Sequence, residues 1–203
     1  MLHNINRITI RGSLLELPKP SHENHGKRFY RFYLEVPRLS GAVDTLPVIA
    51  DEWLLNQIDL SGGEMLTVTG QIRSHNSRVD GVRHLIIFVF ADSIVAEDGN
   101  AINDVVIEGA LCREPTFRRT PLGREICDVM LAVPRAFQRA DYLPCILWGR
   151  TAQEISTCHT RDQIRICGRL QSRIYTKQTE NGPEERVAYE ISALNADILD
   201  ESM

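Results

Sequence analysis

Residues 8–14 read ITIRGSL, and residues 105–111 repeat this pattern as VVIEGAL at an offset of 97 residues. After one inserted residue the repeat continues, because VTGQIRS at 68–74 corresponds to ICGRLQS at 166–172. A period of this length exceeds the roughly 20–50 residues of a solenoid repeat and lies within the usual range of whole domains. The sequence therefore predicts two tandem copies of one small domain.

The two domains are expected at residues 1–96 and 102–199, joined by the short acidic segment AEDGNA at 96–101. The chain has 203 residues with 43% hydrophobic and 25% charged side chains, which is enough apolar material for two modest cores. Its longest apolar run, at 85–91, is too short to span a bilayer, and residues 1–10 lack the features of a signal peptide. We therefore expect a cytoplasmic protein without membrane contact.

Both copies are expected to consist mainly of strands, because apolar and polar residues alternate over short stretches bounded by glycine and proline. The expected strands of the first copy lie at 4–16, 27–38, 44–50, 64–75 and 82–95. Those of the second copy lie at 103–113, 123–134, 142–149, 162–173 and 185–198. A short helix is expected after Asp51 in the first copy and after Arg150 in the second. Five strands with a helix between the third and fourth are typical of the OB fold, so the predicted class is all-β with two tandem five-stranded OB barrels.

The second copy contains the stretches NDVVIEGAL at 103–111, WGRTAQE at 148–154 and GRLQSRIY at 168–175. Through these stretches it closely resembles the bacterial single-stranded DNA-binding protein family. The resemblance implies a protein that binds and protects single-stranded DNA without marked sequence preference, in support of replication, recombination or repair. It also implies that the binding aromatic residues of the family fall on Phe137, Tyr142, Trp148 and Tyr175. The first copy resembles the family only through the internal repeat.

The alternation of side chains in the second copy agrees with this resemblance. Arg165, Arg169 and Arg173 are expected on the strand face opposite to the apolar side chains, together with Tyr175. Bases of a single strand stack on aromatic rings for about 1–3 kcal/mol each, while basic side chains follow the phosphates. The expected DNA-binding residues are Phe137, Tyr142, Trp148, Tyr175, Arg118, Arg119, Arg135, Arg165, Arg169 and Arg173.

The charge of the second copy also favours nucleic acid, although the whole chain has a net charge of -4. Residues 113–173 contain eleven arginines and six acidic residues, a local excess of positive charge. A single aromatic residue on a strand is often only packed against its neighbours, and a single arginine is often only solvated. Four aromatic positions that coincide with the resemblance make mere packing a poorer explanation.

The first copy lacks this combination and is expected to be a degenerate OB domain. The positions of the four aromatic residues are occupied there by Ser40, Thr45, Asp51 and Ser77. The remaining basic residues near its last loop are Arg73, His75, Arg78, Arg83 and His84. These side chains fit either a weaker phosphate contact or a solvated hairpin, and the solvated hairpin is the favoured interpretation.

No catalytic or cofactor site is expected. The sequence contains no phosphate-binding glycine loop, nucleophile elbow or metal-spaced histidine pair, and its five cysteines show no zinc-site spacing. The alternative function is an OB-fold protein-interaction or primosomal accessory module that binds nucleic acid weakly. A steep loss of oligonucleotide affinity with salt distinguishes a DNA-binding protein from such a module.

The resemblance implies a homodimer with four OB domains, because members of the family with one OB domain per chain associate as tetramers and those with two can reach the same four domains as dimers. Domains of this size have little core to spare, and exposed strand edges favour pairing. Light scattering on the full chain at micromolar concentration should therefore give twice the mass of one chain, 23.0 kDa. A monomer mass across that concentration range would contradict the expectation.

Overall fold

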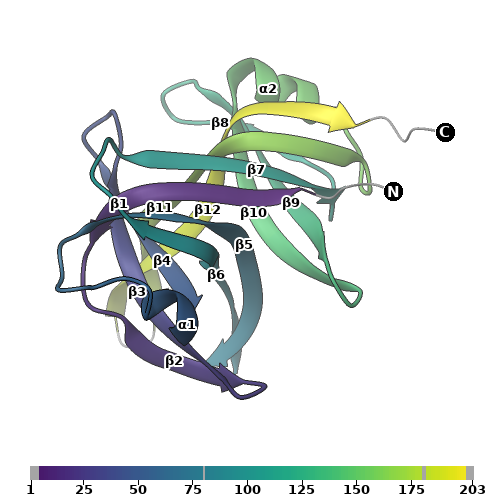
Figure 1. Ribbon diagram of the computed structural model, residues 1–203. Coiled ribbons are helices and arrows are strands. Elements are labelled where there is room, and N and C mark those ends of the chain that lie inside the picture. Colours follow the sequence, from purple (N-terminus) through teal and green to yellow (C-terminus); the bar gives the residue numbers. More distant parts are fainter. Residues whose placement is uncertain (1–4, 80, 180–181, 200–203) are drawn as a thin grey trace.

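The computed structural model describes residues 5–79, 81–179 and 182–199 and shows two β-barrels side by side (Figure 1). Asn4, the expected start of the first strand, lies outside the described residues. The first half contains β1 (Asn6–Leu14), β2 (Lys19–Asn24), β3 (Lys27–Pro37), β4 (Val43–Asp51), α1 (Glu52–Leu55), β5 (Met65–Val79) and β6 (Val82–Ala96). The second half contains β7 (Ile102–Leu111), β8 (Thr116–Arg119), β9 (Glu125–Arg135), β10 (Arg139–Trp148), α2 (Gly149–Ile155), β11 (Gln163–Thr179) and β12 (Gly182–Leu199).

Each half closes into a five-stranded barrel, as the sequence predicted. In the first half β1 pairs with both β5 and β3, and a short parallel pairing between β4 and β6 completes the ring. In the second half β7 pairs with both β11 and β9, and β10 and β12 form the corresponding parallel pairing. The helix lies between the third and fourth barrel strands in both halves, which is the arrangement of the OB fold.

Two strands, β2 and β8, were not expected from the sequence. Each pairs only with the next strand along the chain, and every residue of both strands is exposed. They carry no alternation of apolar and polar residues, so the pattern that identifies strands is missing. The helices agree better with expectation, since Asp51 caps α1 through a 2.9 Å hydrogen bond from the Leu54 amide and α2 begins at Gly149.

The aromatic cluster on β3 divides between the core and the outer surface. Phe29 and Phe32 are buried, whereas Tyr30 and Tyr33 remain half-buried. The period of two places Phe32 in the barrel core, whereas Phe29 lies on the opposite face of β3 and is covered by the rings of His22 and Phe90.

Glycines that recur in the repeat permit close backbone contacts in both barrels. A Cβ atom on Gly168 would lie 2.3 Å from the Ser192 carbonyl oxygen, and one on Gly70 would lie 2.0 Å from that of Phe90. Both glycines stand beside a β-bulge, where β11 meets β12 and β5 meets β6. The repeated glycine therefore marks a bend in the barrel wall that has no room for a side chain.

The two barrels share one continuous sheet, because β1 pairs with β7 in antiparallel register from Asn6 opposite Ile107 to Arg11 opposite Ile102. Figure 1 shows these two strands side by side where the halves meet. The linker between β6 and β7 is only residues 97–101, and the Glu97 amide donates to the Met65 carbonyl at 3.1 Å. The linker thus follows the first barrel instead of separating the two halves.

Two buried aspartates join the halves in a reciprocal way. Asp141, which is 0% exposed, accepts a 2.6 Å hydrogen bond from the Ser74 amide, and the Ser74 hydroxyl accepts one of 2.7 Å from the Tyr142 amide. In the matching arrangement the Ser172 amide donates to Asp44 at 2.7 Å. Buried carboxylates require such partners, so each barrel provides the hydrogen bonds that the other needs.

The bend at Gly168 yields a stability prediction. Gly168→Ala should lower the free energy of unfolding by about 1–3 kcal/mol, because the new methyl group meets backbone and not a movable side chain. Gly123→Asn is the control: Gly123 has a φ of +78° with open space around it, and asparagine tolerates that conformation at a cost under about 1 kcal/mol. Urea unfolding of both variants measures the difference, and equal stability would contradict the proposed contact.

Candidate nucleic-acid interface

Two of the expected aromatic residues lie on the outer face of β10. Leu143, Cys145 and Leu147 point into the barrel and are buried, so Tyr142 and Trp148 point outward. Tyr142 is 46% exposed and Trp148 is 37% exposed. The Trp148 indole Nε1–H donates to the Ser192 hydroxyl on β12 at 3.1 Å, which holds the ring at the end of the strand where α2 begins.

Phe137 lies in the turn between β9 and β10 and is 94% exposed. Its backbone has a φ of +60°, an uncommon conformation for a large side chain. A fully exposed phenylalanine in a turn contributes nothing to the barrel core, and its ring is available to a planar partner.

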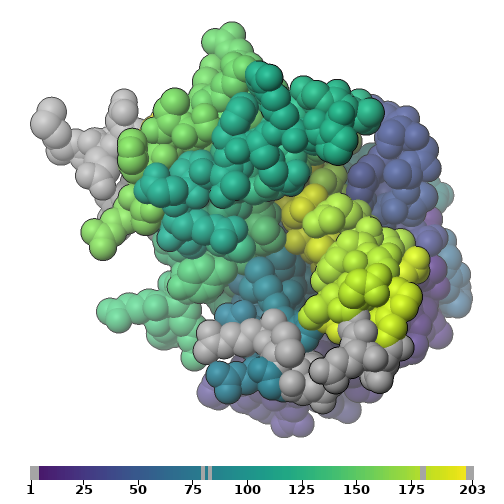
Figure 2. Space-filling model, turned by 180° about the vertical axis from the view of Figure 1, so that it is seen from behind, coloured from purple at the N-terminus to yellow at the C-terminus, as the bar shows by residue number. Residues whose placement is uncertain are grey.

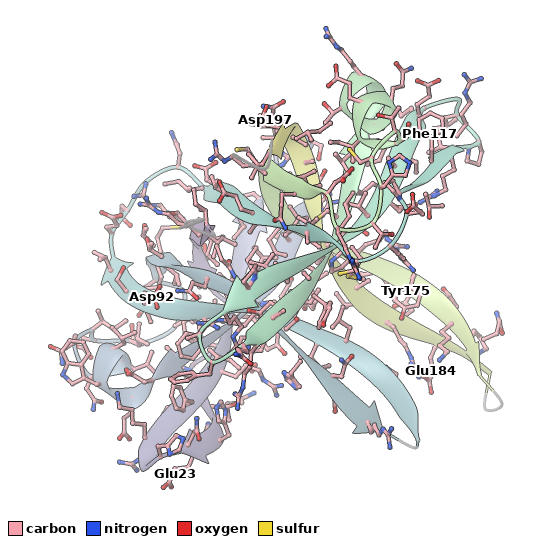
Figure 3. The ribbon with its side chains drawn as sticks, turned by 90° about the vertical axis from the view of Figure 1, so that its right-hand side faces the viewer. Glu23, Asp92, Phe117, Tyr175, Glu184 and Asp197 are labelled. Atoms are coloured by element: carbon pink, nitrogen blue, oxygen red, sulfur yellow. The ribbon has the colours of Figure 1, made fainter. Side chains whose placement is uncertain are left out.

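Tyr175 lies on the long hairpin of β11 and β12, which extends away from the barrel body (Figure 3). It is 37% exposed, and the Arg173 guanidinium lies 5.7 Å from the centre of its ring. Tyr175 and Pro144 of β10 line the same groove, of about 840 Å³. The structure therefore places Tyr175 on the side of the barrel that presents Tyr142.

Several of the expected arginines form ion pairs with neighbouring carboxylates. Arg118 donates to Asp128 at 2.6 Å, Arg119 lies 2.8 Å from Glu125, and Arg173 lies 3.9 Å from Glu190. The hydrogen bond to Asp128 raises the pKa of Arg118, and the nearby charges of Asp128 and Glu190 add to this effect. This face of the second barrel therefore carries both positive and negative side chains beside the exposed aromatic rings.

The barrel separates the arginines that sequence alternation placed on one face of β11. The buried set Ile164, Ile166 and Leu170 agrees with the predicted alternation. Arg165, however, lies 2.6 Å from Glu108 of β7, close to the seam between the barrels. Arg169 lines a different groove beside the linker, and only Arg173 lies next to Tyr175. A coiled strand in a closed barrel carries successive outward residues around its circumference, so one face in sequence is not one surface in space.

Arg135 occupies the junction between the barrels. Its Nη1 donates to the buried Asp141 at 3.2 Å, and its side chain remains 29% exposed. The same junction contains Arg73 of β5, which sequence analysis left as part of a solvated hairpin. Only 19% of the Arg73 side chain is exposed. Burial is the largest cause that lowers the pKa of Arg73, and the positive charge of the neighbouring Arg135 lowers it further. The side chain of Arg83, another member of that group, lies outside the described residues.

In the first barrel the matching positions have structural contacts instead of aromatic rings. Asp51 caps α1, and the Thr45 amide donates to the Ser172 hydroxyl of the second half at 3.4 Å. Figure 2 shows the β11–β12 hairpin in yellow-green in front of the purple first half, and its residues Val187 and Tyr189 line one groove with residues of the first barrel. Tyr33 and Tyr189 line the groove between them, of about 730 Å³, and burial raises the pKa of Tyr189 to about 12. The second half thus borders the face of the first barrel that is equivalent to its own, and β6 of the first half likewise borders the groove that contains Pro144 and Tyr175.

Other site types find no support in the described part of the chain. Within it, no group of three or more His, Cys, Asp and Glu side chains is arranged to hold a metal ion. No helix in the same ranges is long and apolar enough to cross a membrane. Burial raises the pKa of the Cys127 thiol to about 11, and it also raises that of Cys145, so both thiols stay protonated at neutral pH.

Comparison with known proteins shows similarity to single-stranded DNA-binding proteins. A family model described as "Single-strand binding protein family" matches residues 102–199. Single-stranded DNA-binding protein B of Bacillus subtilis is 34% identical over 83 residues, which are 37% of this chain and 74% of the relative. Single-stranded DNA-binding protein 1 of Lactococcus lactis is 34% identical over 84 residues, 38% of this chain and 56% of the relative.

The two-barrel arrangement also has a counterpart among solved structures. The crystal structure of the wild-type single-stranded DNA binding protein from Thermus aquaticus superimposes with a TM-score of 0.81 at 21% sequence identity. The match covers 98% of this chain and 95% of that chain. The similarity therefore extends over both barrels, and at 21% identity it shows a shared fold.

Proposed function

Because the chain belongs to the single-strand binding protein family, we propose that its second barrel coats single-stranded DNA without marked sequence preference. The observation that carries this proposal is the set of exposed rings on one barrel: Phe137, Tyr142, Trp148 and Tyr175. Bases of any sequence present a flat π-face, so exposed aromatic rings stack on them without contacting the base edges that differ between sequences. The action is passive, since a protein that binds only exposed strands shifts the equilibrium away from duplex by mass action. The family consists of DNA-binding proteins, not enzymes.

Phosphate contacts would come from the arginines around this face. Arg118, Arg119 and Arg173 each neighbour one carboxylate, so an incoming phosphate competes with that carboxylate for the guanidinium. Competition of this kind reduces the gain from each contact, and exposed ion pairs are weak enough to exchange. We therefore assign most of the binding energy to stacking and the salt dependence to a few arginines.

For the whole protein we propose a homodimer that supports replication, recombination or repair. One chain already contains two barrels in a shared sheet, so two chains would present four. The second barrels would then act together, and linked sites raise apparent affinity through effective concentration.

The alternative is a protein-docking module that binds nucleic acid weakly. Asp128 and Glu190 beside the arginines favour it, because carboxylates on a binding face repel phosphates. Affinity for oligothymidylate at two salt concentrations separates the two functions. A DNA-binding protein shows measurable affinity that falls steeply as salt rises, and a docking module shows little binding at either concentration.

Tryptophan fluorescence tests the position of the interface. Oligothymidylate should quench the emission of the protein, because Trp148 lies on the proposed face and its ring is 37% exposed. Trp148→Phe should remove most of the quenching. Trp53 is 67% exposed on α1 of the first barrel, so Trp53→Phe serves as the control and should leave the quenching in place. Loss of the signal in the control alone would show that the face is misassigned.

Alanine substitution tests the stacking mechanism. Trp148→Ala and Tyr175→Ala should each weaken oligothymidylate binding by about 1–3 kcal/mol, as expected for the loss of one stacked base. Ser77→Ala, at the position that matches Tyr175, and Ser40→Ala, at the position that matches Phe137, should change the affinity little. Equal losses in both barrels, measured by fluorescence anisotropy, would contradict a dominant second barrel.

A further inference from the structure

The junction of the two barrels contains two related grooves that have diverged. The basic groove, of about 640 Å³, is lined by residues of both halves, including Asn6, Gln71, Arg73, Arg135, Phe137 and Arg139. The second groove, of about 770 Å³, is lined at the matching positions by Asn103, Arg169 and Arg38, together with Leu39, Asp44 and Leu194. The same structural position thus occurs twice, which allows a direct comparison of the charges.

The two grooves differ in net charge. The lining of the basic groove includes Arg73, Arg135 and Arg139 and no carboxylate. The lining of the second groove balances its two arginines with two aspartates, Asp44 and Asp104. Asp141 beneath the basic groove offsets one of its three positive charges, so the groove keeps an excess of positive charge that attracts anions.

The buried carboxylate beneath each groove shows where the excess charge arises. Asp44 is paired with Arg38 alone, whose Nε donates to it at 2.7 Å. Asp141 instead faces both Arg135 and Arg73, and the Arg73 Nη1 lies 3.8 Å from its Oδ2, beyond hydrogen-bond distance. One buried carboxylate therefore faces two guanidinium groups, and Asp92 adds a weaker attraction for Arg73.

Arg73 is also incompletely satisfied by the protein. Its Nε is buried and has no hydrogen-bond partner among the described residues, and the Asp141 Oδ2 lacks one as well. Its guanidinium lies 5.7 Å from the centre of the Phe90 ring, and its side chain lines the groove. A buried donor without a partner costs free energy that an anionic ligand would recover.

We propose that the basic groove binds a backbone phosphate of single-stranded DNA at the point where the strand passes from the second barrel to the first. Arg73 and Arg139 donate to the phosphate from opposite barrels. The exposed ring of Phe137, at the rim of the groove, stacks on the adjoining base. This inference rests on the proposed function and assigns the first barrel a direct part in binding, through β5.

The test compares two charge-removing variants with a matched control. Arg73→Gln and Arg139→Gln remove the groove charge from either barrel, and Arg139 is exposed and not paired with Asp141, so its loss leaves the seam intact. Arg7→Gln is the control: it makes the same charge change in the first barrel, at an exposed residue of β1 that does not line the groove. The probes are oligothymidylates of about 8 and about 30 nucleotides, since one OB barrel holds about 4–16.

For the long probe, each groove variant should lower the affinity about fivefold relative to Arg7→Gln. Each should also reduce the slope of log affinity against log salt by about 0.7, the value for one phosphate contact of a single strand. The affinity for the short probe should fall less, because one barrel can bind this probe without the groove at the junction. Unfolding midpoints of all variants confirm that the seam is preserved.

The outcomes separate this inference from the proposed function. The proposal is overturned if both groove variants bind the long probe as Arg7→Gln does. It is also overturned if Arg73→Gln alone weakens binding with an unchanged salt slope, because Arg73 would then act only by holding Asp141. If the groove assignment fails in one of these two ways while Trp148→Ala and Tyr175→Ala still weaken binding, the proposed function stands. If those two variants also bind normally, the proposed function itself fails.

Discussion

The antiparallel pairing of β1 with β7 is the constraint on which the rest of the structure depends. Both strands belong to closed barrels, and their mutual hydrogen bonds turn two barrels into one sheet of twelve strands. Strand edges that would otherwise be open to other chains are thereby satisfied within the protein. The pairing also determines the orientation of the halves, so that β10 of one barrel meets β5 of the other.

The reciprocal aspartates show how the duplicated sequence supports this arrangement. Asp44 reaches Ser172 and Asp141 reaches Ser74, so equivalent residues of the two halves exchange the same hydrogen bonds across the junction. The surroundings then diverge. Aromatic rings gather on the second barrel, while the first barrel uses the matching positions to cap α1 and to bind the second half. One copy presents the proposed stacking rings, and the other contributes Arg73 to the groove at the junction.

Much of the fold could be predicted from the sequence, because the signals are local. Alternating residues such as Ile164 and Ile166 identify the barrel strands, and Asp51 identifies the start of α1. The strands β2 and β8 could not be predicted, since wholly exposed residues show no alternation. Of the candidate site, the four aromatic positions could be selected from the resemblance. The ion pairs of Arg118 and Arg165 could not be predicted, because their carboxylate partners belong to other strands.

The sequence by itself determined that the chain has two copies of one barrel and that the aromatic rings belong to the second. Repeats, alternation and glycines are properties of neighbouring residues, and backbone geometry translates them directly into strands and bends. Only the tertiary structure decided which charges meet. Arg73 is an ordinary strand residue in sequence, yet the pairing of β1 with β7 brings it to Asp141 and Arg135 of the other half. Electrostatic interactions depend on distance in space, and the sheet that joins the barrels sets that distance.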